Sequence, residues 1–520
     1  MKNLSFFSRK VSFDAHNLVL VPKQRRRLSA FIRVCAVFVG MFFACLQFAN
    51  AQPFARHHWL NPMGENYTLS PPTSRGEWII AAPRNERLTS GAFAARKNTI
   101  AVFRLDNAYN IVPSSACPEE VSVIGMDAGG VFNPDADFVV NCIVESCNPD
   151  EAYVLCGSVS MSPSDPHVGM VAVLDAQLNL VDMRRYPNVR VLNSIYAQDG
   201  YYYAGGQENN GVGIVLRDNI AAATSSFWSV SVFETTIPWD FHKIAVRENS
   251  CSQAYAEIAV SGTDGGNMGW ASFLIIGSMG MFTHNHDMMF APPFGINSKV
   301  PIAYYPPVAA SQDLLLSASS GAEIHGYVIN TVPSYAISRA FSIHWDGELE
   351  DMDCSGDKVA WVGKAYGSPI PIPVPFPVAE YIRTDITINP PADIISFFPP
   401  QNTSGYYHLH KVHYSARDNE FHAGGYFEGF DTQNNPNRTT FAVTPEPFQQ
   451  TNCNFLRQEH NINPFPDPPI LHLPLTSTNI QGNLFQGLTK KFGFCTMDCD
   501  GNKTDDCGNQ ELGNPILNKN

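Results

Sequence analysis

The pattern of apolar and polar positions repeats one short unit along the chain. In its clearest copy, residues 201–218, an aromatic run ends at Gly205-Gly206, and apolar residues then alternate at Val212, Ile214 and Leu216. Such alternation is typical of a β-strand with one buried face, and the polar Gly/Asn stretch between the two runs is typical of a turn. The unit therefore predicts two antiparallel strands joined as a hairpin.

Six further copies of this hairpin are expected along the chain. They pair residues 77–82 with 99–106, 153–158 with 169–175, 258–262 with 270–274, 314–318 with 326–329, 359–363 with 379–383, and 421–425 with 440–443. A residue without a Cβ atom permits close backbone approach, so we align the copies on the small residue that ends the first strand. The aligned positions are Gly157, Gly205, Gly262, Ala318, Gly363 and Gly424, at intervals of 45 to 61 residues.

This spacing predicts an all-β fold of repeated sheets. Periods near 40 to 50 residues with four strands each are typical of the blades of a β-propeller. Further strands at 193–197, 226–233, 298–305 and 335–341 flank two of the hairpins, so each copy has room for four strands. Seven copies predict seven blades, and a β-sandwich or two stacked barrels is the alternative.

Four regions are expected from this reading. Residues 1–51 form an export signal, 52–76 a leading segment, 77–450 the propeller, and 451–520 a C-terminal extension with a Cys- and Asp-rich tail. Residues 113–150 read as mostly loop. The first blade needs a partner strand, which 471–475 or a strand after Phe441 would supply.

Composition agrees with many short strands and turns. Charged residues make up 16% of the chain and aromatic residues 12%, with 37 Gly and 38 Pro. A disordered chain or a coiled coil would be richer in charge and poorer in aromatics.

The N-terminal sequence predicts export. Basic residues between Lys23 and Arg33 precede an apolar run, 34–48, which leads to the cleavage motif Ala49-Asn50-Ala51. The alternatives are an uncleaved anchor, for which the run is shorter than the roughly 20 residues that a membrane helix needs, and a lipid anchor at Cys45. We expect no other membrane span, and a periplasmic, cell-surface or extracellular location.

Net charge limits the classes of binding partner, and the cysteine count predicts disulfides. The signal holds eight of 34 basic residues and one of 48 acidic residues, so its removal changes the net charge from −14 to −21. Nucleic acid and anionic membranes are therefore not expected as partners. Ten cysteines remain, without a C-x-x-C motif, and an even number in an exported chain favours disulfides.

The tail contains a candidate calcium site. Carboxylate and amide oxygens, which Ca²⁺ prefers, are concentrated at Asp498, Asp500, Asn502, Asp505 and Asp506. Lys503 stands where an EF-hand requires Gly, and a solvated, disulfide-tied tail is the alternative.

Other candidate sites have simpler structural interpretations. His408 and His410 share a face of one strand, with His422 as a third metal ligand from the next strand and His413 pointing away. His284 and His286 have the same spacing. The acidic group Glu348, Glu350, Asp351 and Asp353 reads as a solvated loop. No G-x-S-x-G motif, P-loop or dinucleotide fingerprint is present, although carboxylates from separate blades would leave no local motif.

The order aromatic-x-Ala/Cys-Gly-Gly/Ser, polar loop, Gly-x-Val-x-x-Leu-Asp resembles the repeats of secreted bacterial seven-bladed β-propellers. The resemblance covers roughly 77–450. The copies near 314 and 359 and the Pro-rich insert 369–377 depart from it. It implies a closed ring with loop-built faces and no particular catalytic residues.

We therefore expect a binding module rather than an enzyme, with a protein or glycan partner. No cofactor is required by the sequence, and calcium is the one candidate. Trp239 and Phe294, beside Pro-containing turns, are expected as contact residues. The alternatives are a hydrolase or lyase acting on polysaccharide or peptide at the central channel, and a structural surface or adhesin component. A plugged channel with an apolar rim favours binding, and a deep channel mouth with two carboxylates or a His/Asp group within reach favours catalysis.

Overall fold

The computed structural model describes most of residues 55–497, in which all regular structure is β-strand. Residues 1–54 and 498–520 lie outside the described part, as do shorter internal segments, the longest being 85–95, 366–377 and 444–454. The chain divides into two units, Met1–Gln52 and Pro53–Asn520, and the strands belong to the second. Among the described residues, no helix is long and apolar enough to cross a membrane.

Sets of four antiparallel strands are the repeated element of the second unit. The first set is β2 (Thr68–Leu69), β3 (Trp78–Arg84), β4 (Thr99–Leu105) and β6 (Glu120–Met126), with β5 (Ile111–Val112) paired to β4. The second is β7 (Asp137–Glu145), β8 (Tyr153–Ser160), β9 (Val168–Leu174) and β10 (Leu180–Tyr186). The third is β11 (Val189–Gln198), β12 (Tyr201–Glu208), β13 (Val212–Asn219) and β14 (Phe227–Pro238).

The later sets repeat this order. The fourth is β15 (Asp240–Arg247), β16 (Tyr255–Thr263), β17 (Met268–Ile276) and β18 (Met281–Phe290). The fifth is β19 (Ile302–Tyr305), β20 (Asp313–Ser320), β21 (Glu323–Asn330) and β22 (Ala336–His344). The sixth is β23 (Gly347–Ser355), β24 (Lys358–Ala365), β25 (Val378–Asp385) and β26 (Ala392–Phe397).

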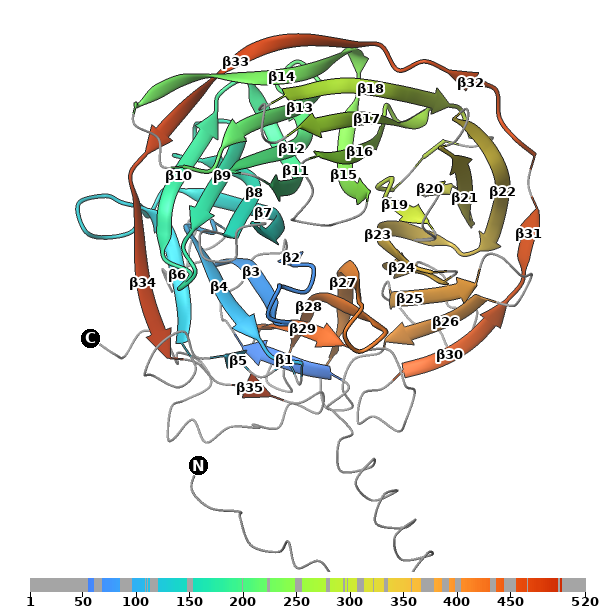
Figure 1. Ribbon diagram of the computed structural model, residues 1–520. Helices are drawn as coiled ribbons and strands as arrows, with labels where there is room; N and C mark the ends of the chain where they lie inside the picture. Colours follow the sequence, from blue (N-terminus) through green and yellow to red (C-terminus); the bar gives the residue numbers. More distant parts are fainter. Residues whose placement is uncertain are drawn as a thin grey trace, which may run out of the picture. The chain divides into compact units, whose positions relative to one another are not determined.

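The seventh set combines the two ends of the chain. It contains β27 (Ser404–Ser415), β28 (Glu420–Phe430) and β29 (Pro436–Val443), and its fourth strand is β1 (Ala55–Trp59) from the leading segment. Figure 1 shows the sets following one another around a common centre, with the first strand of each set innermost. The N-terminal strand thus joins the last set to the first.

The C-terminal extension adds an outer strand to every set, in reverse order along the chain (Figure 1). We call this segment the belt. Its strands are β30 (Phe455–His460), β31 (Ile462–Pro464), β32 (Ile470–Leu471), β33 (Leu475–Phe485), β34 (Gly487–Gly493) and β35 (Thr496–Met497). They pair in turn with β26, β22, β18, β14 together with β10, β6, and β1.

Strand β33 joins the second and third sets into one nine-stranded sheet. The sheet runs β11-β12-β13-β14-β33-β10-β9-β8-β7 and curves until its end strand β11 lies against β7 and β8. The other five sheets each hold one set and one belt strand.

Hydrophobic clusters lie between neighbouring sets. One cluster joins the second and third sets through Val154, Leu192 and Ile214, and another joins the first to the seventh through Trp78 and Tyr426. Burial of these faces against one another, about 25 cal/mol per Å² of apolar surface, favours the packed arrangement. The belt contributes as well, because Leu473 is buried in the cluster between the third and fourth sets.

Most predicted strands are confirmed, and two expectations are wrong. All seven hairpins form, including β12 and β13 in residues 201–218. Residues 113–150, expected as mostly loop, contain β6 and β7. Residues 471–475 are also wrong as the partner of the first set, whereas the other candidate, a strand after Phe441, agrees with β34, which pairs with β6. Strand β1 completes the seventh set.

Candidate functional site

Bulges in the inner strands direct polar side chains towards the centre. In five sets the pairing of the first two strands shifts by one residue, and the extra residues are Asn141, Asn193, His242, Glu350 and His410. A bulge bends its strand and re-aims the side chain that it carries. Four of these five side chains line the central cavity.

A glycine on the second strand accommodates each bulge. It pairs with the apolar residue just before the bulge, and the five glycines are Gly157, Gly206, Gly262, Gly363 and Gly425. A Cβ atom at any of them would lie 1.6 to 2.2 Å from a carbonyl oxygen of the inner strand. The close approach therefore requires glycine.

The alignment made from sequence is corrected by one residue in two copies. Gly205 and Gly424, the expected equivalents of Gly157, precede the glycines opposite the bulges. Cβ atoms there would instead meet side chains of neighbouring sets, Val260 and Leu69, at 2.9 Å. Each of these two copies has two consecutive glycines. The sequence does not show where the inner strand bulges, so it did not show which of the two glycines lies opposite the bulge. The copy that has Ala318 in place of glycine has no bulge where β19 pairs with β20.

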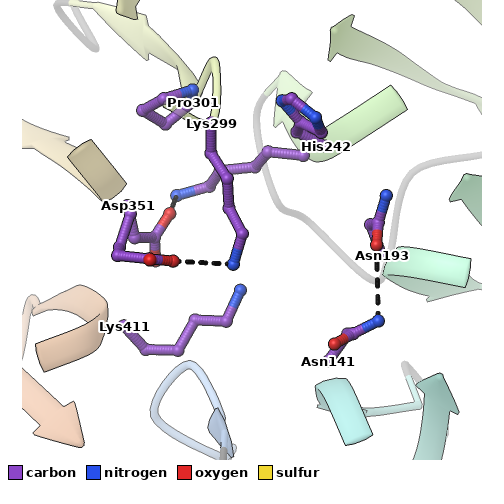
Figure 2. Close-up of a pocket in the computed structure, with 9 residues that line it drawn as sticks. Asn141, Asn193, His242, Lys299, Pro301, Asp351 and Lys411 are labelled. Carbon is purple, nitrogen blue, oxygen red and sulfur yellow. Dashed lines mark hydrogen bonds and ion pairs between the residues drawn. The ribbon is translucent and has the colours of Figure 1, made fainter. Parts of the chain in front are cut away.

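Charged residues of three inner strands pair at the centre (Figure 2). Lys243 on β15 lies 2.7 Å from Asp351 Oδ1 on β23, and Lys299, before β19, lies 2.8 Å from Glu350 Oε2. His410 Nδ1 on β27 is 3.5 Å from the same Glu350 oxygen. The expected solvated acidic loop is therefore wrong: Glu350 and Asp351 lie on an inner strand, and Asp351 is 1% exposed.

The pairing sets the ionisation of these groups. Burial opposes the charge of Asp351, but the Lys243 and Lys411 ammonium groups outweigh it and lower its pKa to about 2. Burial likewise opposes the charge of Glu350, and Lys299 and His410 hold its pKa well below the usual range. Both carboxylates are thus charged near neutral pH and hold no proton for acid catalysis.

A small cavity remains between the pairs. The centre of a water molecule has about 10 Å³ of space inside this cavity. The cavity therefore holds about one water molecule. Lys411 on β27 also lines it, and Figure 2 shows this side chain extending towards Lys299. The three lysines were missed from sequence because they are 56 and 112 residues apart and share no local motif.

Side chains also connect each inner strand to the next. Asn141 Nδ2 donates to Leu192 O at 2.9 Å, and Asn193 Nδ2 donates to Asp240 Oδ1 at 2.8 Å. Between the seventh and first sets, His413 Nε2 is 3.0 Å from Leu69 O. Burial lowers the pKa of His413 to about 3, so it is neutral and Nε2 is the donor to this carbonyl.

An open depression lies beside the centre. It has a volume of about 430 Å³ and shares His242 with the central cavity. The lining residues are Gln207, Pro238, Trp239, Asp240, His242, Thr263, Asp264, Gly265, Ile296 and Ser298. Trp239 was expected as a contact residue, but it is 1% exposed and its ring contacts Phe241. Phe294 lies outside the described residues.

An Asp–His pair lies at the inner wall of the depression. His242 Nδ1 accepts the Val300 N–H at 2.9 Å, which assigns the ring proton to Nε2. That nitrogen is 3.5 Å from Asp240 Oδ2. The Asp240 side chain is 33% exposed and thus accessible to a ligand, whereas Asp264 is held by hydrogen bonds within its own loop.

The predicted histidine sites do not assemble as expected, and the calcium site stays a prediction. The calcium candidates Asp498, Asp500, Asn502, Asp505 and Asp506 lie outside the described residues. The four histidines do not converge: His408 and His410 stack at 5.9 Å, His413 reaches Leu69, and His422 contacts Asp418. His284 pairs with Asp287, while His286 stacks on Tyr335.

The described cysteines are not in disulfides. Cys142, Cys156 and Cys354 are free thiols, although Cys142 and Cys156 face each other on β7 and β8. The disulfide expectation is thus wrong for these three. Burial, and then the neighbouring Cys142, raise the pKa of Cys156, so its thiolate is disfavoured. The other seven cysteines of residues 52–520 lie outside the described part.

A scan against models of protein families and a search of curated proteins both found no match. The resemblance to secreted bacterial propellers stays a prediction.

Proposed function

We propose that the protein is an exported seven-bladed β-propeller that binds a glycan in the depression beside His242. Seven sets of four strands in chain order, with their first strands innermost, support the propeller. The strand β1, which completes the seventh set, is a means of closing such a ring.

The filled centre favours binding over catalysis. Glu350 and Asp351 are paired with lysines, and the space between them holds about one water molecule. A substrate has no room there. The open depression, by contrast, has the usual size of a small-ligand site, roughly 300 to 1,000 Å³.

The chemistry of the depression favours a glycan. Carboxylate, amide and hydroxyl groups dominate its lining, and these accept and donate the hydrogen bonds that sugar hydroxyls make. Pro238 and Ile296 add apolar surface against which a sugar ring packs. The Asp240 carboxylate accepts from Asn193 and lies beside His242, and its 33% exposed side chain leaves lone pairs for a sugar hydroxyl.

Glycan-array screening of the purified protein, followed by calorimetry, tests this proposal. We expect binding that Asp240→Asn weakens about tenfold, since a charged hydrogen bond contributes about 1.5 to 3 kcal/mol. Asp165→Asn, on an exposed loop away from the depression, is the matched control. Equal affinity in both variants, or binding to proteins alone, would overturn the glycan assignment.

The Asp240–His242 pair favours the alternative, a hydrolase or lyase. An imidazole held by a carboxylate is a common general base. Catalysis would be supported if the native protein releases product from a bound polysaccharide and His242→Gln does not. Binding alone would be supported if the ligand is unchanged after prolonged incubation with the native protein.

A further inference from the structure

The turn between β27 and β28 brings three side chains with metal-binding atoms together. Asp418 lies in the turn, and Glu420 and His422 follow on one face of β28. One ligand atom from each residue lies within 4.8 Å of the other two. Of the four grouped histidines, His422 thus lies with two carboxylates rather than with the other three.

His422 is held in a fixed orientation. The residue is 1% exposed, and its ring lies against Trp78 with the centroids 4.3 Å apart. The buried Tyr109 hydroxyl is 2.5 Å from His422 Nδ1, and Nε2 is 2.9 Å from Asp418 Oδ2. Histidines that bind metals commonly have the second ring nitrogen engaged in this way, which orients the ligating nitrogen.

Among the described residues, Asp418 is paired with His422 and Glu420 has no cationic partner. Glu420 has no hydrogen-bond or ion-pair partner among the described residues, and Asp418 Oδ1 is buried without a hydrogen bond. A cation between these groups would compensate both carboxylates.

We propose that Asp418, Glu420 and His422 bind one divalent transition-metal ion, for which Zn²⁺ fits the donor set. Zinc accepts imidazole nitrogen together with carboxylate oxygen, and three protein ligands leave a fourth position for water. Calcium prefers oxygen ligands alone, so the imidazole selects against it. This site is independent of the glycan-binding proposal.

The metal would connect the two ends of the fold. Trp78 on β3 and Tyr109, between β4 and β5, belong to the first set, whereas His422 belongs to the seventh. With the metal on Nε2, the Nδ1 proton is donated to the Tyr109 oxygen. Binding therefore stabilises the junction between these sets, because only the folded chain assembles the ligands.

Zinc titration of the full protein, purified without a histidine tag, tests the proposal. We expect Asp418→Asn and Glu420→Gln to remove one bound zinc ion per chain. Tyr109→Phe keeps the packed ring and should weaken zinc affinity by about 10- to 100-fold. Zinc should also raise the Tm of the native protein, and Ca²⁺ at the same concentration should not.

Glu323→Gln is the matched control. Glu323 and His325 have the same spacing on β21, with Nε2 of His325 3.8 Å from Glu323, but no acidic residue stands at position 321. Its zinc stoichiometry should equal that of the native protein. Unchanged stoichiometry and affinity in both Asp418→Asn and Glu420→Gln would overturn the site, and the circular dichroism of each variant separates ligand loss from unfolding.

Discussion

At the residue scale, His413 couples the central charges to the junction between the first and seventh sets. Its Nε2 proton is donated to Leu69 O, and Asp351, Asp353, Lys243 and Lys411 surround it. Burial is the main reason why its pKa falls from 6.5 to about 3. Protonation of His413 therefore opposes folding.

We predict that His413 makes the protein less stable as the solution is acidified. The unfolded chain takes up the proton near pH 6.5 and the folded chain only near 3, so stability is complete above 6.5 and is lost towards 3. Between pH 7 and 5 the loss is about 2 kcal/mol. His413→Gln should show a correspondingly smaller loss in urea unfolding at the two pH values, and equal losses would contradict the assignment.

Asp351 does not contribute in this interval. Its pKa in the folded protein is about 2, below the ordinary 3.8, so its stabilisation persists above pH 4 and is lost between 4 and 2. The two residues are thus separable by the pH range in which stability changes.

At the element scale, the bulge and its glycine form one unit of structure. The inner strand contains one extra residue, and the polar side chain of that residue points to the centre. The paired strand has a glycine at this position because a Cβ atom would clash with the inner strand. The sequence pattern of an apolar residue followed by a polar one, as in Leu192-Asn193 and Leu349-Glu350, accompanies the bulge but does not reveal it.

We predict that Gly206→Ala destabilises the protein by about 3 kcal/mol or more. Its Cβ atom would lie 2.0 Å from Val191 O, so the backbone of β11 or β12 has to shift. Gly266→Ala is the control, since the nearest atom to its Cβ is 3.6 Å away in an exposed loop. Similar denaturant midpoints for the two variants would argue against a required glycine at position 206.

At the scale of the whole molecule, the belt covers the outer edges of all seven sets. An uncovered edge strand exposes unpaired backbone groups and promotes aggregation. The belt also buries side chains, because Leu473, Ile462 and Ile480 lie in three different hydrophobic clusters. It therefore stabilises the sets together.

We predict that removal of residues 455–520 lowers the Tm and causes association. Every set loses its outermost strand, including the nine residue pairs between β14 and β33. Removal of 498–520 alone leaves all belt strands in place and should keep the native Tm. Differential scanning calorimetry and light scattering compare the two chains, and a stable, monomeric chain ending at 454 would contradict this role.

The sequence by itself determined the strands and their grouping. Apolar alternation and turn residues are local signals, so the hairpins at 153–175, 201–218 and 258–274 followed from short stretches of chain. The same signals failed where strands were short or polar, as in β1 and most of the belt. The partners of β1 and β33 are 240 or more residues away in the sequence, and no local pattern records them.

Only the tertiary structure decided which polar residues meet. Lys243, Lys299, Glu350, Asp351 and Lys411 come from four sets, and none carries a signal that distinguishes it from a surface charge. The same holds for Tyr109 and His422, which are 313 residues apart. Strand formation depends on neighbours in sequence, whereas the site depends on side chains that packing of the sets brings together.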